Sequence, residues 1–120
     1  MEIKALNEIT EVVAPDKSII REWVAPGNSR AKKMSMAEIT IPPGVKVPPH
    51  YHQVIEETYF ILEGEGEMEL GDEKRTMSAG EAVVILPNER HTIANKTDKP
   101  LKMYVTCVPA WTFEESVFVE

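Results

Sequence analysis

The positions of proline and glycine place the strongest restriction on how this chain can fold. Nine prolines and six glycines fall between short segments rich in valine, isoleucine, methionine and aromatic residues. Proline removes a backbone donor and both residues weaken element interiors, so they mark turns. Short apolar segments between frequent turns predict strands rather than helices. We therefore expect an all-β protein.

About nine short strands at regular spacing indicate a sandwich, a barrel or a jelly roll. The expected segments are 17–25, 33–41, 58–64, a hairpin over 65–77 that turns at Gly71-Asp72, 81–87, 101–108 and 117–120. The continuous apolar run AVVIL at 82–86 predicts burial on both faces, as when two sheets stack. Only the first dozen residues could form a helical turn.

Length and charge limit the classes of function. The 120 residues fit one compact domain, and the net charge of -7 argues against a nucleic-acid partner, which would require a clustered positive surface. No apolar run approaches the roughly 20 residues of a membrane helix, and the N-terminal MEIKALNEIT lacks a secretory signal. We expect a cytoplasmic protein that does not enter a membrane.

The single cysteine, Cys107, cannot form an intramolecular disulfide, which agrees with a reducing compartment. It lies in LKMYVTCV, where apolar and polar residues alternate, and no basic neighbour in sequence would lower the pKa of its thiol. We therefore interpret Cys107 as a packing residue rather than a reactive one.

Two of the three histidines lie one residue apart in the segment HYH. Residues two apart on a strand point to the same face, so His50 and His52 present two imidazoles in one direction. Of the adjacent carboxylates Glu56 and Glu57, only one can face the same interior; Glu57 shares its parity with Tyr59. The third histidine, His91, follows PNER at the start of another expected strand.

Three imidazoles and one carboxylate suit a divalent transition metal: Mn, Fe, Ni, Co, Cu or Zn. An octahedral ion with four protein ligands keeps two positions for water or substrate. A solitary histidine is more often a surface or core residue, and the HYH pair alone would be weak support for a metal. The joint pattern of both segments is what favours a metal centre.

That pattern resembles the two signature motifs of the cupin superfamily. The first runs from 44 to 64: Gly44, five residues, His50 and His52 around Tyr51, four residues, Glu57, six residues and Gly64. The second runs from 80 to 95: Gly80, ten residues, His91, three residues and Asn95. Leu86 and Asn88 occupy positions where the family usually has proline and glycine. Asn88 can replace glycine because asparagine tolerates a left-handed conformation.

The resemblance implies a single cupin domain over residues 1–120, folded as a double-stranded β-helix, a jelly-roll barrel with a metal inside one open end. It also implies that His50, His52, Glu57 and His91 are the metal ligands. The flanking strands resemble those of small cupins labelled as related to mannose-6-phosphate isomerase. Tyr59 is a candidate catalytic residue because its hydroxyl could donate to a substrate. Alternation places four aliphatic residues beside the ligands: Ile61, Val83, Ile85 and Ile93. They could line the cavity, but we favour core packing for them.

Three functions fit the sequence. The first is a metal-dependent enzyme, of the oxygenase, isomerase/epimerase or decarboxylase type, acting on a small oxygen-bearing metabolite. The second is a non-catalytic metabolite-binding or sensing cupin; we favour the enzyme because this chain carries no signalling domain. The third, a storage or structural cupin, does not need three histidines directed at one place. A phosphosugar isomerase would also need a basic phosphate clamp, and the basic residues here are scattered.

The terminal strands predict a homodimer. Strands at 17–24 and 115–120 would leave open sheet edges on a lone barrel, and pairing across a two-fold axis would cover them.

Overall fold

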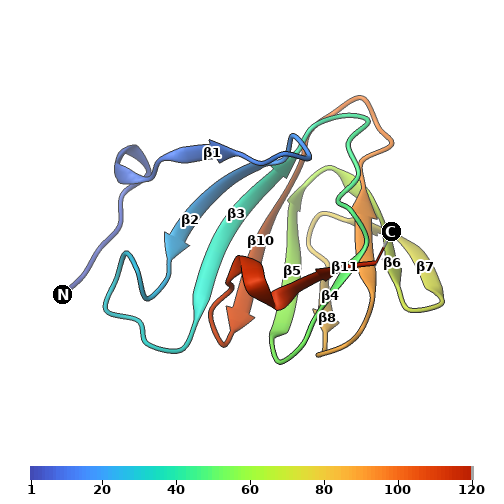
Figure 1. The fold of residues 1–120 in the computed structure, drawn as a ribbon. Helices are drawn as coiled ribbons and strands as arrows, with labels where there is room; N and C mark the ends of the chain where they lie inside the picture. Colours follow the sequence, from blue (N-terminus) through green and yellow to red (C-terminus); the bar gives the residue numbers. More distant parts are fainter. Residues whose placement is uncertain (120) are drawn as a thin grey trace.

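The computed structural model describes residues 1–119 as two antiparallel β-sheets with two short 3₁₀ helices, η1 (Leu6–Glu8) and η2 (Phe113–Glu115) (Figure 1). In spatial order, the six-stranded sheet contains β1 (Glu11–Val13), β2 (Ile19–Val24), β3 (Ser35–Ile41), β10 (Leu101–Val108), β5 (Glu56–Glu63) and β8 (Ala82–Ile85). The five-stranded sheet contains β11 (Ser116–Phe118), β4 (His50–His52), β9 (His91–Ala94), β6 (Glu65–Leu70) and β7 (Glu73–Ser78). The all-β jelly-roll prediction is confirmed.

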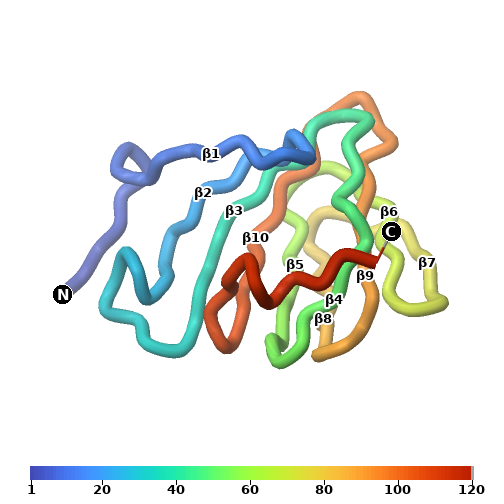
Figure 2. The backbone as a smooth tube through the Cα atoms, viewed as in Figure 1, coloured from blue at the N-terminus to red at the C-terminus, as the bar shows by residue number. Residues whose placement is uncertain are grey.

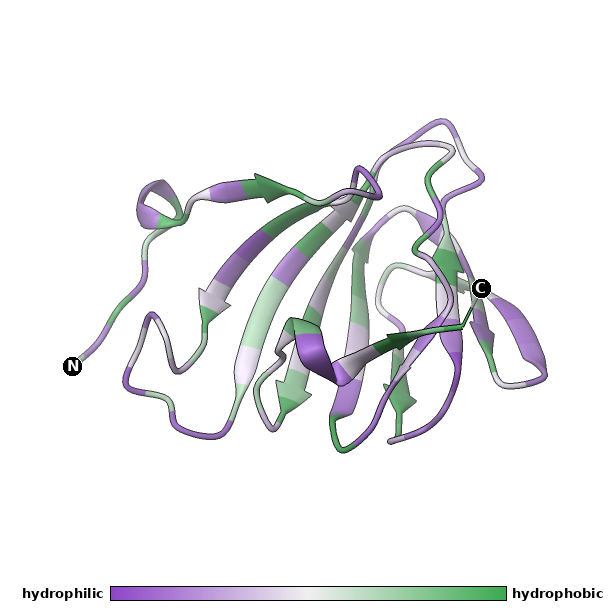
Figure 3. Ribbon diagram, viewed as in Figure 1, coloured by the Kyte–Doolittle hydropathy of each residue, from purple (hydrophilic) through white to green (hydrophobic). Residues whose placement is uncertain are grey.

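The core lies between the two sheets and comes from alternate residues of their strands. Along β10 the buried residues are Leu101, Met103, Val105 and Cys107, as the alternation predicted. Figure 3 shows hydrophobic and hydrophilic bands alternating along the long strands of this sheet. The N-terminus and the β6–β7 hairpin lie on opposite sides of the molecule (Figure 2). Across residues 1–119, no helix is long and apolar enough to span a membrane.

Two predicted turns have the expected backbone. Gly71 closes the β6–β7 hairpin with φ 58°, and Asn88 has φ 67° before β9. The Asn88 N–H donates to the carbonyl oxygen of His52 at 2.7 Å. The left-handed turn therefore ties the segment before His91 to the strand that carries the other two histidines.

Two expectations about the strands are wrong. Val84 and Leu86 are 61% and 47% exposed, because β8 is an edge strand whose outer face no element covers. The helical turn expected in the first dozen residues is present as η1, and η2 is a second one near the C-terminus. Glu11–Val13 forms a strand that pairs with β2. Because β1 pairs with it, β2 is not the edge strand that the sequence predicted. The edge strands near the two ends of the chain are β1 and β11. The predicted last strand lies at β11, and residue 120 is outside the described range.

Candidate metal centre

Strand pairing brings the three histidines together on the inner face of the five-stranded sheet. His50 and His52 lie on β4, and His91, the first residue of β9, pairs directly with His50. The ring centroids are 4.3 Å apart for His50 and His91, 5.0 Å for His50 and His52, and 5.4 Å for His52 and His91. One nitrogen from each ring lies within 4.8 Å of the others, so the three could hold a metal ion.

Glu57 reaches the same point from β5 in the opposing sheet. Its Oε1 lies 3.1 Å from His91 Nε2 and 3.3 Å from His52 Nε2. Glu56 is exposed, as the parity argument predicted. All four residues are buried: the exposed fraction is 0% for His91, 1% for His52, 5% for Glu57 and 7% for His50. All four predicted ligands therefore meet at one buried point.

Backbone carbonyls fix the orientation of two of the rings. His50 Nδ1 lies 2.8 Å from the oxygen of Pro48, and His91 Nδ1 lies 2.9 Å from the oxygen of Glu89. A carbonyl oxygen only accepts, so Nδ1 carries the proton in each neutral ring and Nε2 carries the free lone pair. That tautomer directs a ligand atom from each ring toward the shared point.

Several atoms at this point are buried without a hydrogen-bond partner: both ring nitrogens of His52, Glu57 Oε1 and His91 Nε2. Glu57 Oε1 lies close to both imidazoles but makes no hydrogen bond with either. An unsatisfied buried polar atom costs about 1–3 kcal/mol. Within residues 1–119, the other such side-chain atom is Trp23 Nε1 on β2. The donor set fits a bound cation, which would satisfy Glu57 Oε1, His91 Nε2 and one ring nitrogen of His52 together.

In the metal-free protein, the pKa shifts of His50 and Glu57 favour the protonation states that a metal requires, whereas that of His52 favours its protonated form. Burial, then the nearby charge of His91, lowers the pKa of His50 from 6.5 to about 4. Burial alone would raise the pKa of Glu57, but contacts with His52 and His91 outweigh it and lower the value to about 2. Burial likewise opposes protonation of His52, but Glu57 raises its pKa above 6.5. The carboxylate is therefore ionised and His50 neutral at pH 7.

Cys107 contacts the candidate ligand Glu57, a relation that the sequence reasoning missed. It pairs with Glu57 across β10 and β5, and its Sγ lies 3.4 Å from Glu57 Oε2. The thiol donates, because an ionised carboxylate only accepts. Burial, followed by the charge of Glu57, raises the pKa of Cys107, which agrees with an unreactive packing residue. Oε2 is thereby held on the side of Glu57 away from the histidines.

Tyr59 lies beside the site, and its aliphatic neighbours form core. Its ring centroid is 5.9 Å from that of His91, and burial raises the pKa of its hydroxyl well above 10, so the hydroxyl stays protonated. Of the four aliphatic residues predicted beside the ligands, Ile61, Ile85 and Ile93 belong to the buried core. Val83 is half-buried and packs against that core.

The C-terminal segment contributes an aromatic neighbour that the sequence did not reveal. β11 pairs with β4, and the ring centroid of Phe118 lies 5.7 Å from that of His50. Glu115 Oε1 accepts hydrogen bonds from the backbone N–H groups of Gln53 at 3.0 Å and Val54 at 2.8 Å. The segment from η2 to β11 is thus fixed against the loop that follows His52 (Figure 2).

A model of the cupin domain matches residues 37–107, a range that contains both motifs. The chain belongs to the cupin family. This cupin is 36% identical over 114 residues to the uncharacterized protein MJ1618 of Methanocaldococcus jannaschii, and the alignment covers 95% of this chain and 91% of that protein.

Solved structures share the fold at lower sequence identity. A predicted oxalate decarboxylase from Thermotoga maritima has a TM-score of 0.81 and 22% identity, covering 90% of this cupin and 99% of that chain. The polyketide cyclase RemF from Streptomyces resistomycificus has a TM-score of 0.80 and 19% identity, covering 90% of this cupin and 79% of that chain. The mannose-6-phosphate isomerase-like subtype stays a prediction.

Proposed function

We propose that this cupin is a divalent-metal-dependent enzyme that acts on a small oxygen-bearing molecule, as an oxygenase, an isomerase or epimerase, or a decarboxylase. The observation that carries the proposal is the set of buried, unpartnered lone pairs that converge from β4, β5 and β9. A storage or structural role offers no compensation for burying these atoms.

The proposed ligands are Nε2 of His50, His52 and His91 together with Oε1 of Glu57. A transition-metal ion held there would supply Lewis-acid chemistry, or redox chemistry if the ion is iron, manganese or copper. Glu57 contributes the negative charge that offsets part of a dication. Because burial keeps the Tyr59 hydroxyl protonated, Tyr59 can donate a hydrogen bond to a substrate oxygen. Two fold neighbours are described as a predicted oxalate decarboxylase and a polyketide cyclase, which supports an enzyme on this scaffold.

A matched pair of variants tests the proposal. Protein loaded in turn with each ion would be assayed against a panel of hydroxy acids, enediols and catechols, with oxygen consumption recorded. We expect wild type and Glu56→Gln, whose carboxylate is exposed, to turn over the same substrate, and Glu57→Gln to lose at least 100-fold in kcat/KM.

Binding of a panel compound without turnover by any loaded form would favour the non-catalytic binding module. Failure of the wild type to bind any ion would overturn the metal-dependent proposal.

A further inference from the structure

A cavity of about 580 Å³ lies on the flank of the barrel, at the edge strands β7 and β8. Its apolar walls come from β6, β7 and β8: Met68, Leu70, Met77 and Val83. Charged residues form its rim: Glu73, Lys74, Arg75 and Glu81. None of the four proposed ligands lines it, so its relation to the metal centre has to come from strand pairing.

Strand register connects one wall of this flank cavity to the metal centre. His50 pairs with His91, His91 pairs with Leu70, and Leu70 pairs with Glu73. Directly paired residues of antiparallel strands point to the same face. One row of inner-face side chains therefore runs from the candidate ligands on β4 and β9 to the cavity lining on β6 and β7.

The opposite wall reaches the same neighbourhood through the other sheet. Val83 on β8 pairs with Tyr59 on β5, and the Tyr59 ring lies 5.9 Å from that of His91. Leu70 and Val83 are both half-buried, and both line the cavity. Each wall thus contains a residue that pairs directly with a residue of the metal centre or with Tyr59 beside it.

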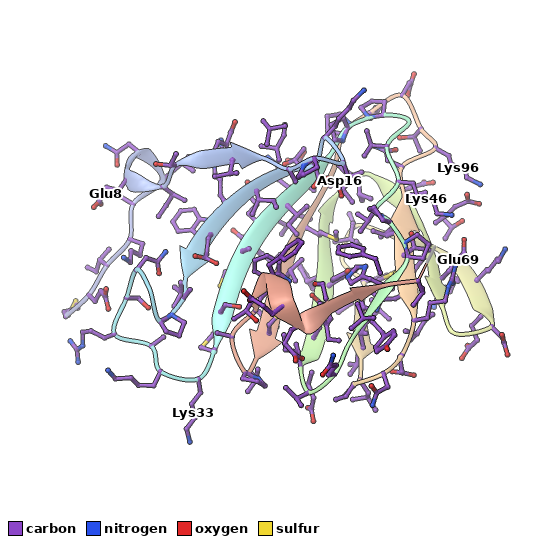
Figure 4. The ribbon with its side chains drawn as sticks, viewed as in Figure 1. Glu8, Asp16, Lys33, Lys46, Glu69 and Lys96 are labelled. Atoms are coloured by element: carbon purple, nitrogen blue, oxygen red, sulfur yellow. The ribbon has the colours of Figure 1, made fainter. Side chains whose placement is uncertain are left out.

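The lining selects for an apolar ligand of low charge. Met68 and Met77 are buried in the walls, and methionine adapts its shape to a flat molecule. At the rim, Arg75 is paired with Glu81 at 2.6 Å. Lys74 turns to the outer face of β6, where its Nζ lies 3.9 Å from Glu69 Oε1; Figure 4 shows Glu69 there, near Lys46. The rim therefore has no cation cluster for a phosphate group.

We propose that the flank cavity is the substrate cavity of the metal centre, and that it takes a small molecule with a flat apolar body and an oxygen-bearing end, such as an aromatic diol. This inference rests on the proposed function. The ligand enters between β7 and β8, and its oxygen atoms pass Leu70 and Val83 toward the histidines. A volume of about 580 Å³ lies in the range of small-molecule sites.

The test uses 4-nitrocatechol as probe and full-length protein carrying ¹³C-methyl methionine, in metal-free and zinc-loaded forms. The NMR signals of Met68 and Met77 should shift on titration, whereas that of Met103, a core residue outside the cavity lining, should not. Zinc should tighten binding at least tenfold, because the diol then reaches the ion. Equal affinity with and without zinc would overturn the connection to the metal centre.

Two adjacent residues of β8 provide matched variants. Val83→Trp fills the cavity and should weaken binding at least tenfold while zinc content stays at the wild-type level. Val84→Trp changes the exposed face of the same strand and should bind like wild type. If Val83→Trp loses its folded spectrum, Val83→Phe is the smaller substitution, and it should also weaken binding.

Equal binding by the Val83 and Val84 variants, or NMR shifts that spare Met68 and Met77, would overturn the proposal. If the wild type binds no zinc but 4-nitrocatechol still shifts the signals of Met68 and Met77, the result would instead count against the proposed function.

Discussion

Cys107 should position Glu57, because its thiol donates to Oε2 while Oε1 lies against His52 and His91. Partners of metal ligands typically change metal affinity 10–100-fold when they are removed, and a thiol is a weak donor, so the lower end applies. We expect Cys107→Ala to weaken zinc binding about tenfold and Cys107→Ser, which keeps a donor, to stay within about threefold of wild type. Calorimetric titration measures both affinities. Equal affinities for Cys107→Ala and wild type would show that the contact does not orient the ligand.

His50 should make the stability of the metal-free protein depend on pH. Its pKa is lowered to about 4 in the fold, whereas the unfolded chain takes up the proton near 6.5. The unfolded state therefore binds more protons between these values, and stability falls as pH falls through that window, by up to about 1.4 kcal/mol per pH unit. His50→Gln cannot titrate and should lack this contribution. Urea unfolding of both proteins from pH 7 to pH 4, in chelator, measures the difference; parallel curves would contradict the assignment.

The sequence predicted which four side chains meet at the candidate metal centre, but not their other contacts. Alternation and motif spacing were enough to choose Glu57 over Glu56 and to place His50 and His52 on one face. The contact of Cys107 with Glu57 depends on the register between β10 and β5, which join segments about 50 residues apart. The approach of Phe118 to His50 depends likewise on β11 pairing with β4. Register between distant strands is a tertiary property that local patterns do not encode.

The bend between β5 and β6 depends on Gly64, the last residue of the first motif. Its φ is 82°, and a Cβ there would lie 2.4 Å from the backbone oxygen of Pro100. Gly64→Ala should therefore lower the free energy of unfolding by about 2–4 kcal/mol. Gly27→Ala is the matched control, because a Cβ at Gly27 meets no atom within 4 Å; its effect should stay within about 0.5 kcal/mol. Urea denaturation compares the two, and an equal loss in both would refute the role of the bend.

Strand order decided which elements the sequence described correctly. Strands in the middle of a sheet, such as β10, show the alternation that burial requires. β8 has the apolar composition of a doubly buried strand but lies at an edge, and β1 is a three-residue strand, too short for alternation to reveal, that pairs with β2. Composition reports how apolar a segment is, whereas edge or centre position depends on the whole topology.

For the molecule as a whole, we propose a homodimer. The edge argument no longer applies to β2, but β1 is an edge strand on which Val12 and Val13 are 57% and 66% exposed. Pairing of this edge with a second copy would cover both side chains and the open backbone groups. Light scattering after gel filtration should give twice the chain mass of 13.5 kDa. Val12→Lys should shift the protein toward monomer, and a wild-type monomer at micromolar concentration would contradict the dimer.

The central claim is that four side chains from three strands form one metal site. The most direct measurement is elemental analysis of protein purified without an affinity tag or chelator, beside His52→Ala and the matched variant Tyr51→Ala, which changes the residue between the two histidines on the opposite face of β4. We predict about one divalent transition-metal ion per chain in wild type and Tyr51→Ala and almost none in His52→Ala. A wild type that holds no metal, and whose melting temperature does not rise when divalent ions are added, would contradict the claim.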